Sequence, residues 1–140
     1  MSKSNSDLWD PIRLQWVAAT PEEVVRQNFI QKMLALGFPK GLISVEKNLA
    51  PDRRIDLLCH TTVKEKIVPL LLVECKAIEI NRAAEQQVFG YNAAIQAPFI
   101  CLANQKEIKT LWKEMDKIAS VPFLPSYAQL VEKLCLLLKL

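Results

Sequence analysis

A short apolar segment that ends in two charged residues constrains this chain more than any other feature. Residues 68–73 are apolar throughout and indicate a strand that is buried on both faces. The segment ends in Glu74 and Lys76, and side chains alternate along a strand, so both should project from the same face. Removing an ionised side chain from water costs roughly several kcal/mol unless the ion is paired or bound to a metal. This strand end is therefore a candidate site.

A second acidic residue, Asp56, lies in residues 53–59, a segment that predicts another short strand. Residues 61–66, between the two strands, are polar and long enough for a turn. The strands can pair as an antiparallel hairpin that brings Asp56 beside Glu74 and Lys76. No Asn-Gly or Asp-Gly turn fixes the register of this pairing.

Two neighbouring carboxylates offer the oxygen ligands that Mg²⁺ or Mn²⁺ accepts. A lysine beside them can orient a metal-bound water or stabilise charge on a phosphate under attack. Asp56, Glu74 and Lys76 are thus suited to cutting a phosphodiester. The alternative is a surface hairpin in which Glu74 and Lys76 form an ordinary ion pair.

The spacing of these residues resembles the PD-(D/E)xK nuclease core, and in particular the small domain at the N-terminus of type I restriction enzyme R subunits. The likeness covers about residues 20–104, with matching blocks at residues 20–27, 54–56, 74–76 and 85–92. The resemblance implies metal ligands at Asp56 and Glu74, a catalytic lysine at Lys76, Mg²⁺ or Mn²⁺ as cofactor, DNA as substrate and a relation to restriction-modification.

The resemblance also implies a glutamate of the first helix near the metal. Glu23 is the candidate, with Glu22 as the alternative if the helical register differs by one residue. Glu23 has a purely structural explanation too, because Thr20 and Glu23 have the spacing of a capping box. Both roles can hold at once.

A second helix carries a glutamine and a tyrosine that the resemblance puts close to the site. Gln87 and Tyr91 are four residues apart and share a helical face, and Gln86 is the alternative glutamine. The other interpretation is an ordinary helix whose polar residues point outward.

Three arginines close to the site in sequence are candidate contacts to nucleic-acid phosphates. They are Arg53, Arg54 and Arg82. The formal net charge of +3 permits nucleic-acid binding without requiring it.

The order of the expected elements predicts an α/β fold of restriction-endonuclease type, with a mixed sheet between helices in three layers. Residues 1–140 should form one domain, in which residues 1–19 are an N-terminal arm, residues 20–104 the core and residues 105–140 C-terminal helices. The expected order is a helix at 20–36, strands at 43–49, 53–59 and 68–75, a helix at 81–95, a strand at 99–103, and helices at 106–119 and after Ser126.

The composition indicates a cytoplasmic protein. The N-terminus lacks the apolar region of a signal peptide, and no segment reaches the roughly 20 apolar residues that span a bilayer. The four cysteines have no C-x-x-C spacing, which favours buried thiols in a reducing compartment over disulfides or zinc.

The sequence as a whole predicts a metal-dependent nuclease that acts on DNA. It contains no Walker A motif, so we expect a free-standing nuclease, a remnant, or a component that acts with a separate motor protein. A catalytically silent module that binds nucleic acid or protein is the alternative, and a structural subunit is a third. A homodimer is compatible with all of them. If Asp56 and Lys76 lie at a site rather than in the core, replacing either with alanine should abolish cleavage and barely affect folding.

Overall fold

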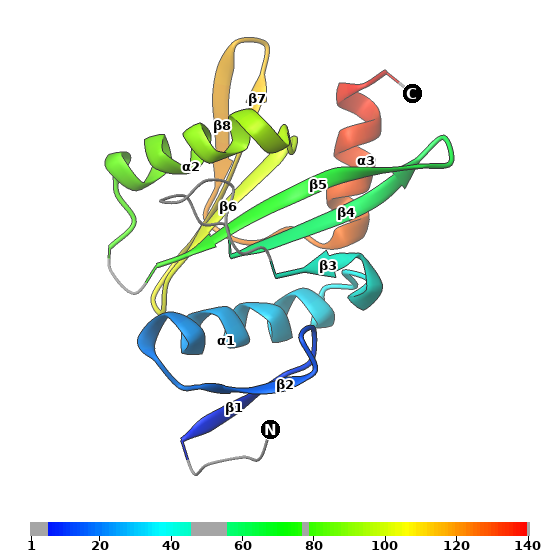
Figure 1. Ribbon diagram of the computed structural model, residues 1–140. Coiled ribbons are helices and arrows are strands. Elements are labelled where there is room, and N and C mark those ends of the chain that lie inside the picture. Colours follow the sequence, from blue (N-terminus) through cyan, green and yellow to red (C-terminus); the bar gives the residue numbers. More distant parts are fainter. Residues whose placement is uncertain (1–5, 46–55, 77–78, 140) are drawn as a thin grey trace.

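A mixed six-stranded sheet forms the centre of the computed structural model, which describes residues 6–45, 56–76 and 79–139. The strands lie in sequence order across the sheet, and β5 and β6 are its one parallel pair in the described residues (Figure 1). The chain passes from β5 to β6 through a helix, as a parallel connection requires. The strands are β3 (Ile43–Ser44), β4 (Leu57–Val63), β5 (Lys66–Cys75), β6 (Phe99–Ala103), β7 (Ile108–Glu114) and β8 (Lys117–Val121).

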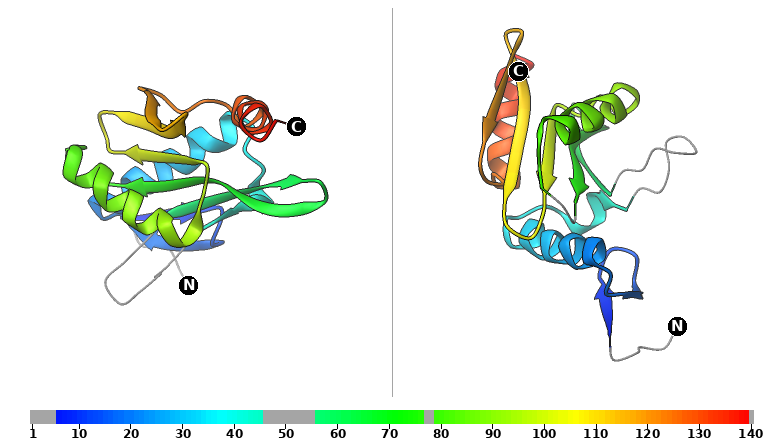
Figure 2. Two further views of the ribbon diagram at one scale, coloured as in Figure 1. Left: turned by 90° about the horizontal axis from the view of Figure 1, so that it is seen from above. Right: turned by 90° about the vertical axis from the view of Figure 1, so that its left-hand side faces the viewer.

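Helices cover the sheet on both sides. Figure 2 shows α2 and α3 on opposite faces, while α1 runs below the sheet in the view of Figure 1. The predicted α/β class with a mixed sheet between helices is confirmed, and the arrangement is consistent with a three-layer restriction-endonuclease-like core. The helices are α1 (Pro21–Ala35), α2 (Arg82–Ile95) and α3 (Tyr127–Leu137), with a short 3-10 helix, η1 (Lys40–Leu42), before β3.

The two faces of β5 bury their side chains in two separate cores. Leu71 and Val73 pack into the core that α1 and α3 share, and Leu72 packs into the core beneath α2. All three are fully buried. The apolar run that predicted a strand buried on both faces is therefore explained by helices on either side.

The predicted hairpin between the two acidic segments is present. β4 and β5 pair antiparallel, with Leu57 opposite Val73. The turn is tighter than expected, because it consists of Lys64 and Glu65, both with positive φ. Residues 53–55, where the sequence predicted the start of β4, lie outside the described residues, as do residues 46–49 of the predicted strand 43–49.

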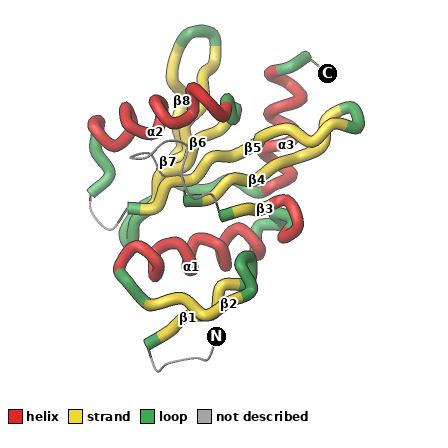
Figure 3. Tube along the Cα trace, viewed as in Figure 1, coloured by secondary structure: helices red, strands yellow, loops and turns green. Residues whose placement is uncertain are grey.

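The prediction of a helix over residues 106–119 is wrong, because this segment forms the hairpin of β7 and β8 (Figure 3). Its apolar residues recur at helical spacing, but Leu111 pairs with Ile100 of β6 and enters the core beneath α2. Met115 and Asp116 adopt positive φ at the turn. Pairing with the edge of β6 thus overrides the helical pattern.

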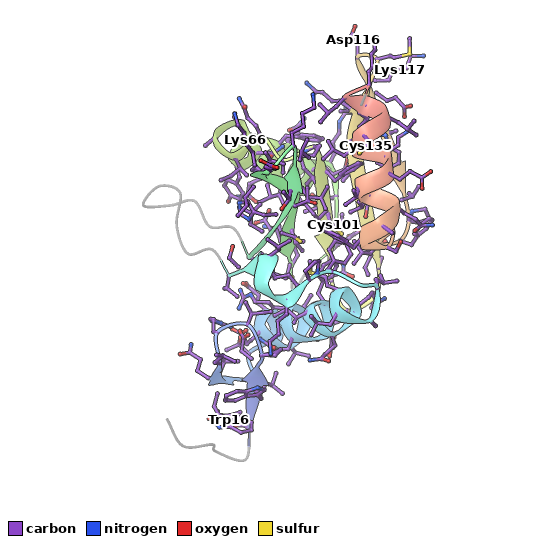
Figure 4. The ribbon with its side chains drawn as sticks, turned by 90° about the vertical axis from the view of Figure 1, so that its right-hand side faces the viewer. Trp16, Lys66, Cys101, Asp116, Lys117 and Cys135 are labelled. Atoms are coloured by element: carbon purple, nitrogen blue, oxygen red, sulfur yellow. The ribbon has the colours of Figure 1, made fainter. Side chains whose placement is uncertain are left out.

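The N-terminal arm is a two-stranded hairpin of β1 (Asp7–Asp10) and β2 (Gln15–Ala18). Trp9 and Trp16 pack edge to face across it, with ring centroids 5.1 Å apart. Figure 4 shows Trp16 at one end of the molecule and Asp116 and Lys117 at the other. That residues 1–140 form one domain stays a prediction.

The helix ends follow the sequence closely. The side chain of Thr20 accepts a hydrogen bond from the Glu23 N–H at the start of α1, and Ser126 and Gln129 form a capping box at α3. Asn81 caps α2 in the same way. Within the described part of the chain, no helix is long and apolar enough to cross a membrane.

Candidate active site

Asp56 lies directly before β4, and the sheet register sets it against the end of β5. Leu57 pairs with Val73, so continuing the antiparallel pairing by one residue brings Asp56 opposite Glu74. The Oδ2 atom of Asp56 accepts a hydrogen bond from the backbone N–H of Cys75 at 2.7 Å. Asp56 is buried. The hairpin thus brings together the two carboxylates that the sequence predicted to meet.

Glu74 and Lys76 project to the same side at the end of β5. The Lys76 Nζ lies 3.2 Å from Glu74 Oε1 and donates a hydrogen bond to Gln87 Oε1 of α2 at 3.0 Å. The other carboxylate oxygen of Glu74, Oε2, is buried and has no hydrogen-bond partner within residues 6–45, 56–76 and 79–139. Because buried acceptors are normally satisfied, this oxygen is available to a ligand.

The surroundings of Glu74 disfavour its ionised form. Burial raises the pKa of the Glu74 carboxyl group, and the ammonium of Lys76 opposes this shift only in part. The negative charges of Asp56 and Glu22 raise the pKa further. Glu74 therefore lies in a group of acids that a cation would stabilise.

Arg26 of α1 connects the first helix to Asp56. Its Nη2 donates to Asp56 Oδ1 and its Nη1 donates to Glu23 Oε2, both at 2.5 Å. Burial acts to lower the pKa of Arg26, but the hydrogen bonds and charges of Asp56 and Glu23 raise it above the usual value. Glu23 thus lies close to the site through Arg26, and Glu22 is exposed beside it.

The N-terminal hairpin is tied to this group by a further arginine. The Nη2 of Arg13 donates to Glu23 Oε1 and its Nε donates to Asp10 Oδ2. Asp10 is fully buried and also accepts the backbone N–H groups of Ile12 and Arg13. An alternating series of charges therefore runs from the arm to Asp56.

Sequence reasoning missed this series. Arg26 is three residues after Glu23 on α1, a spacing that allows an ion pair on one helical face. That signal was available, but nothing in the sequence links Arg26 to Asp56, thirty residues away. Asp10 and Arg13 carried no comparable signal, because their role depends on where the hairpin docks.

The other residues that the sequence suggested for the site differ in whether they contact Asp56, Glu74 or Lys76. Gln87 contacts Lys76, whereas Gln86 is exposed. Tyr91 is buried in the core beneath α2, and Arg82 is exposed in the first turn of that helix. Arg53 and Arg54 lie outside the described residues.

Asp56 and Glu74 are the residues of this site that could hold a divalent cation. No group of three or more histidine, cysteine, aspartate or glutamate residues in the described part of the chain is arranged to hold a metal ion. The two carboxylates of Asp56 and Glu74 nevertheless offer hard oxygen ligands, and Glu74 Oε2 is unpartnered. The donor set fits Mg²⁺ or Mn²⁺ with water completing its coordination, although Arg26 and the Cys75 N–H already contact Asp56.

A groove of about 830 Å³ lies beyond the site, between α1, the β6–β7 turn and the segment after β8. Its lining includes the exposed Phe123 and three lysines, of which Lys109 is paired with Glu85 of α2 at 2.9 Å. Lys32 and Lys106 are the other two. The groove thus offers cations and an aromatic ring close to the start of α2.

The family model for the N terminus of the type I restriction enzyme R protein matches residues 21–125. The chain belongs to this family. The match begins at the first residue of α1 and includes all of β4, β5 and α2, the elements that carry the site. Searches of curated proteins and of solved structures found no match. Membership in the R protein N-terminal family establishes a relation to restriction-modification enzymes.

Proposed function

We propose that this chain is a metal-dependent nuclease domain of the PD-(D/E)xK type, which hydrolyses phosphodiester bonds in DNA. The observation that carries the proposal is the close grouping of Asp56, Glu74 and Lys76 at the ends of two paired strands. The unpartnered, buried Oε2 of Glu74 adds a ligand position for a cation. Membership in the R protein N-terminal family agrees with a DNA substrate.

Asp56 and Glu74 would hold the cation, together with the backbone carbonyl of Cys75. Bound Mg²⁺ or Mn²⁺ would supply Lewis-acid polarisation of the phosphate and a more acidic water. Asp56 is kept in place by the Cys75 N–H, and Glu74 by the ammonium of Lys76.

Lys76 would position the attacking water or balance the charge that develops on the phosphate oxygens. Its Nζ is fixed between Glu74 Oε1 and Gln87 Oε1, which use two of the three ammonium donors. The third donor can face the phosphate. Gln87 is then a positioning residue, since it orients Lys76.

Arg82 would contact a phosphate next to the cleaved bond. It is exposed in the first turn of α2, the helix that also supplies Gln87. Arg53 and Arg54 are proposed phosphate contacts from the sequence alone. A separate motor protein or a second copy of the chain is compatible with this scheme.

The direct test is cleavage of labelled single-stranded and double-stranded DNA in Mg²⁺ or Mn²⁺. Wild type should cut, and Glu74→Gln and Lys76→Met should each lose about 100-fold or more in rate. Glu114→Gln and Lys133→Met are matched controls, because these residues form an ion pair at 3.1 Å between β7 and α3. They should cut as wild type does. Cleavage that survives in Glu74→Gln and Lys76→Met would contradict the proposal.

A second candidate function is a catalytically silent module that binds nucleic acid. The observation that favours it is that both oxygens of Asp56 already have protein partners, namely Arg26 and the Cys75 N–H. In that case DNA binding should occur without cleavage in either metal ion, and Glu74→Gln should bind as well as wild type does.

A further inference from the structure

Arg26 pairs with the negative charge of Asp56, which a divalent cation would otherwise neutralise. We propose that Arg26 is an internal cation that occupies the Asp56 side of the metal site and thereby sets how tightly a divalent ion binds. This inference rests on the proposed function, because it assumes that Asp56 and Glu74 are the ligands. It assigns to Arg26 a role in metal affinity rather than in the chemical step.

The geometry of the Arg26 guanidinium group would let it leave Asp56 without losing all of its contacts. Arg26 bridges two carboxylates with separate nitrogens, one bond to Glu23 and one to Asp56, instead of gripping one carboxylate with both. Its side chain is 4% exposed. Its Nε is buried without a hydrogen-bond partner among the described residues. Arg26 could therefore release Asp56 and keep its bond to Glu23.

An arginine cannot lose its charge to make room for a metal ion. A lysine or histidine can release a proton, but the guanidinium stays protonated in proteins. The contacts with Asp56 and Glu23 strengthen this preference. A divalent ion at Asp56 must therefore either displace Arg26 or bind beside a permanent positive charge, and both reduce its affinity.

The charge balance around Asp56 and Glu74 also favours this role for Arg26. Four acids and three bases form ion pairs around the site and carry a formal charge of −1, and Glu22, whose charge also acts on Glu74, makes it −2. Removing Arg26 makes this charge one unit more negative, which favours the binding of a divalent ion. The ion-paired acids are Asp10, Glu23, Asp56 and Glu74, and the ion-paired bases are Arg13, Arg26 and Lys76.

The test is a calorimetric titration of Mn²⁺ into wild type, Arg26→Gln and Arg13→Gln at pH 7.5. Arg26→Gln should bind Mn²⁺ about tenfold more tightly than wild type or better, because a positive charge next to the ion is removed. Arg13→Gln also removes one positive charge near the site. Arg13 contacts Glu23 and Asp10, however, and not Asp56. The affinity of this variant should change by about threefold at most, because the charge is farther from the ligands.

Equal or weaker Mn²⁺ binding by Arg26→Gln would overturn the inference. The variant also leaves Asp56 and Glu23 without their shared partner, so its folding must be followed separately by circular dichroism. If Arg26→Gln is unfolded without metal, Mn²⁺ should restore the native spectrum, and failure to do so would equally overturn the inference. Arg26→Lys should bind Mn²⁺ more weakly than Arg26→Gln, because it keeps the charge.

Adding Glu74→Gln separates this inference from the proposed function. If wild type and Arg26→Gln bind Mn²⁺ equally and Glu74→Gln loses binding, the metal site stands and the role of Arg26 falls. If Arg26→Gln binds more tightly but no protein cuts DNA, the role of Arg26 stands and the nuclease proposal falls. If neither wild type nor Arg26→Gln binds Mn²⁺, both fall.

Discussion

Asp56 holds the end of β5 in place, because its Oδ2 accepts a hydrogen bond from the backbone N–H of Cys75 at 2.7 Å. The same carboxylate is the partner of the buried Arg26. Asp56 therefore has a structural role in addition to any role in binding a metal. Replacing Asp56 should therefore affect the stability of the fold as well as any binding of a metal.

Asp56→Ala should destabilise the protein strongly, by about 3–5 kcal/mol, because it leaves the buried guanidinium of Arg26 without one of its two carboxylates. The sequence alone suggested that folding would be nearly unchanged. Lys76→Ala should cost about 1 kcal/mol or less, since the side chain of Lys76 is 22% exposed and partly solvated. Urea unfolding of both variants measures the difference. Equal stability of Asp56→Ala and wild type would contradict the importance of the Arg26 contact.

Glu74→Gln should be more stable than wild type at pH 7 to 8. The pKa of Glu74 is raised in the folded protein, mainly by burial, so its ionised form disfavours folding. The stability of wild type relative to Glu74→Gln should therefore be highest below the unfolded pKa of about 4.5 and fall as the pH rises through the folded pKa. Unfolding of both proteins between pH 4 and 8, without metal, measures this. A constant difference across that range would show that Glu74 does not titrate as expected.

Replacing Met115 and Asp116 with Asn and Gly should stabilise the protein by about 1 kcal/mol. Both residues adopt positive φ at the tip of the β7–β8 hairpin, where Asn-Gly is the favoured pair. Met115 is 92% exposed, so little packing is lost. If residues 106–119 were instead a helix, the glycine would destabilise it by about 1 kcal/mol. The sign of the change in thermal unfolding thus distinguishes the hairpin from the helix.

The four cysteines should differ sharply in reactivity with iodoacetamide. Cys59, Cys75 and Cys101 are buried, and burial raises their pKa values, to about 12 for Cys59 and Cys101. Cys135 is partly exposed on α3. Mass spectrometry of the native protein should find one adduct, at Cys135, and all four cysteines should react after denaturation. Rapid labelling of Cys101 in the native protein would argue against its place in the core (Figure 4).

Much of the fold could be predicted from local signals in the sequence. Thr20 before Pro21 marked the start of α1, and the apolar run before Glu74 marked β5. These predictions succeeded because helix caps and buried strands depend on neighbouring residues. The prediction of a helix over residues 106–119 failed for the opposite reason. The apolar spacing of this segment fits a helix, and only its pairing with β6 makes it a strand.

Local patterns along the chain were enough to predict the strand that ends at Glu74 and Lys76 and the kinds of residue at the site. The contacts of Arg26 with Asp56, and of Arg13 from the N-terminal hairpin with Glu23, became visible only in the folded protein. Alternation of side chains along a strand is a local property, so it can be recognised in one segment of the sequence. A buried ion pair depends on how a helix and a hairpin dock against the sheet, and many distant contacts together set that docking.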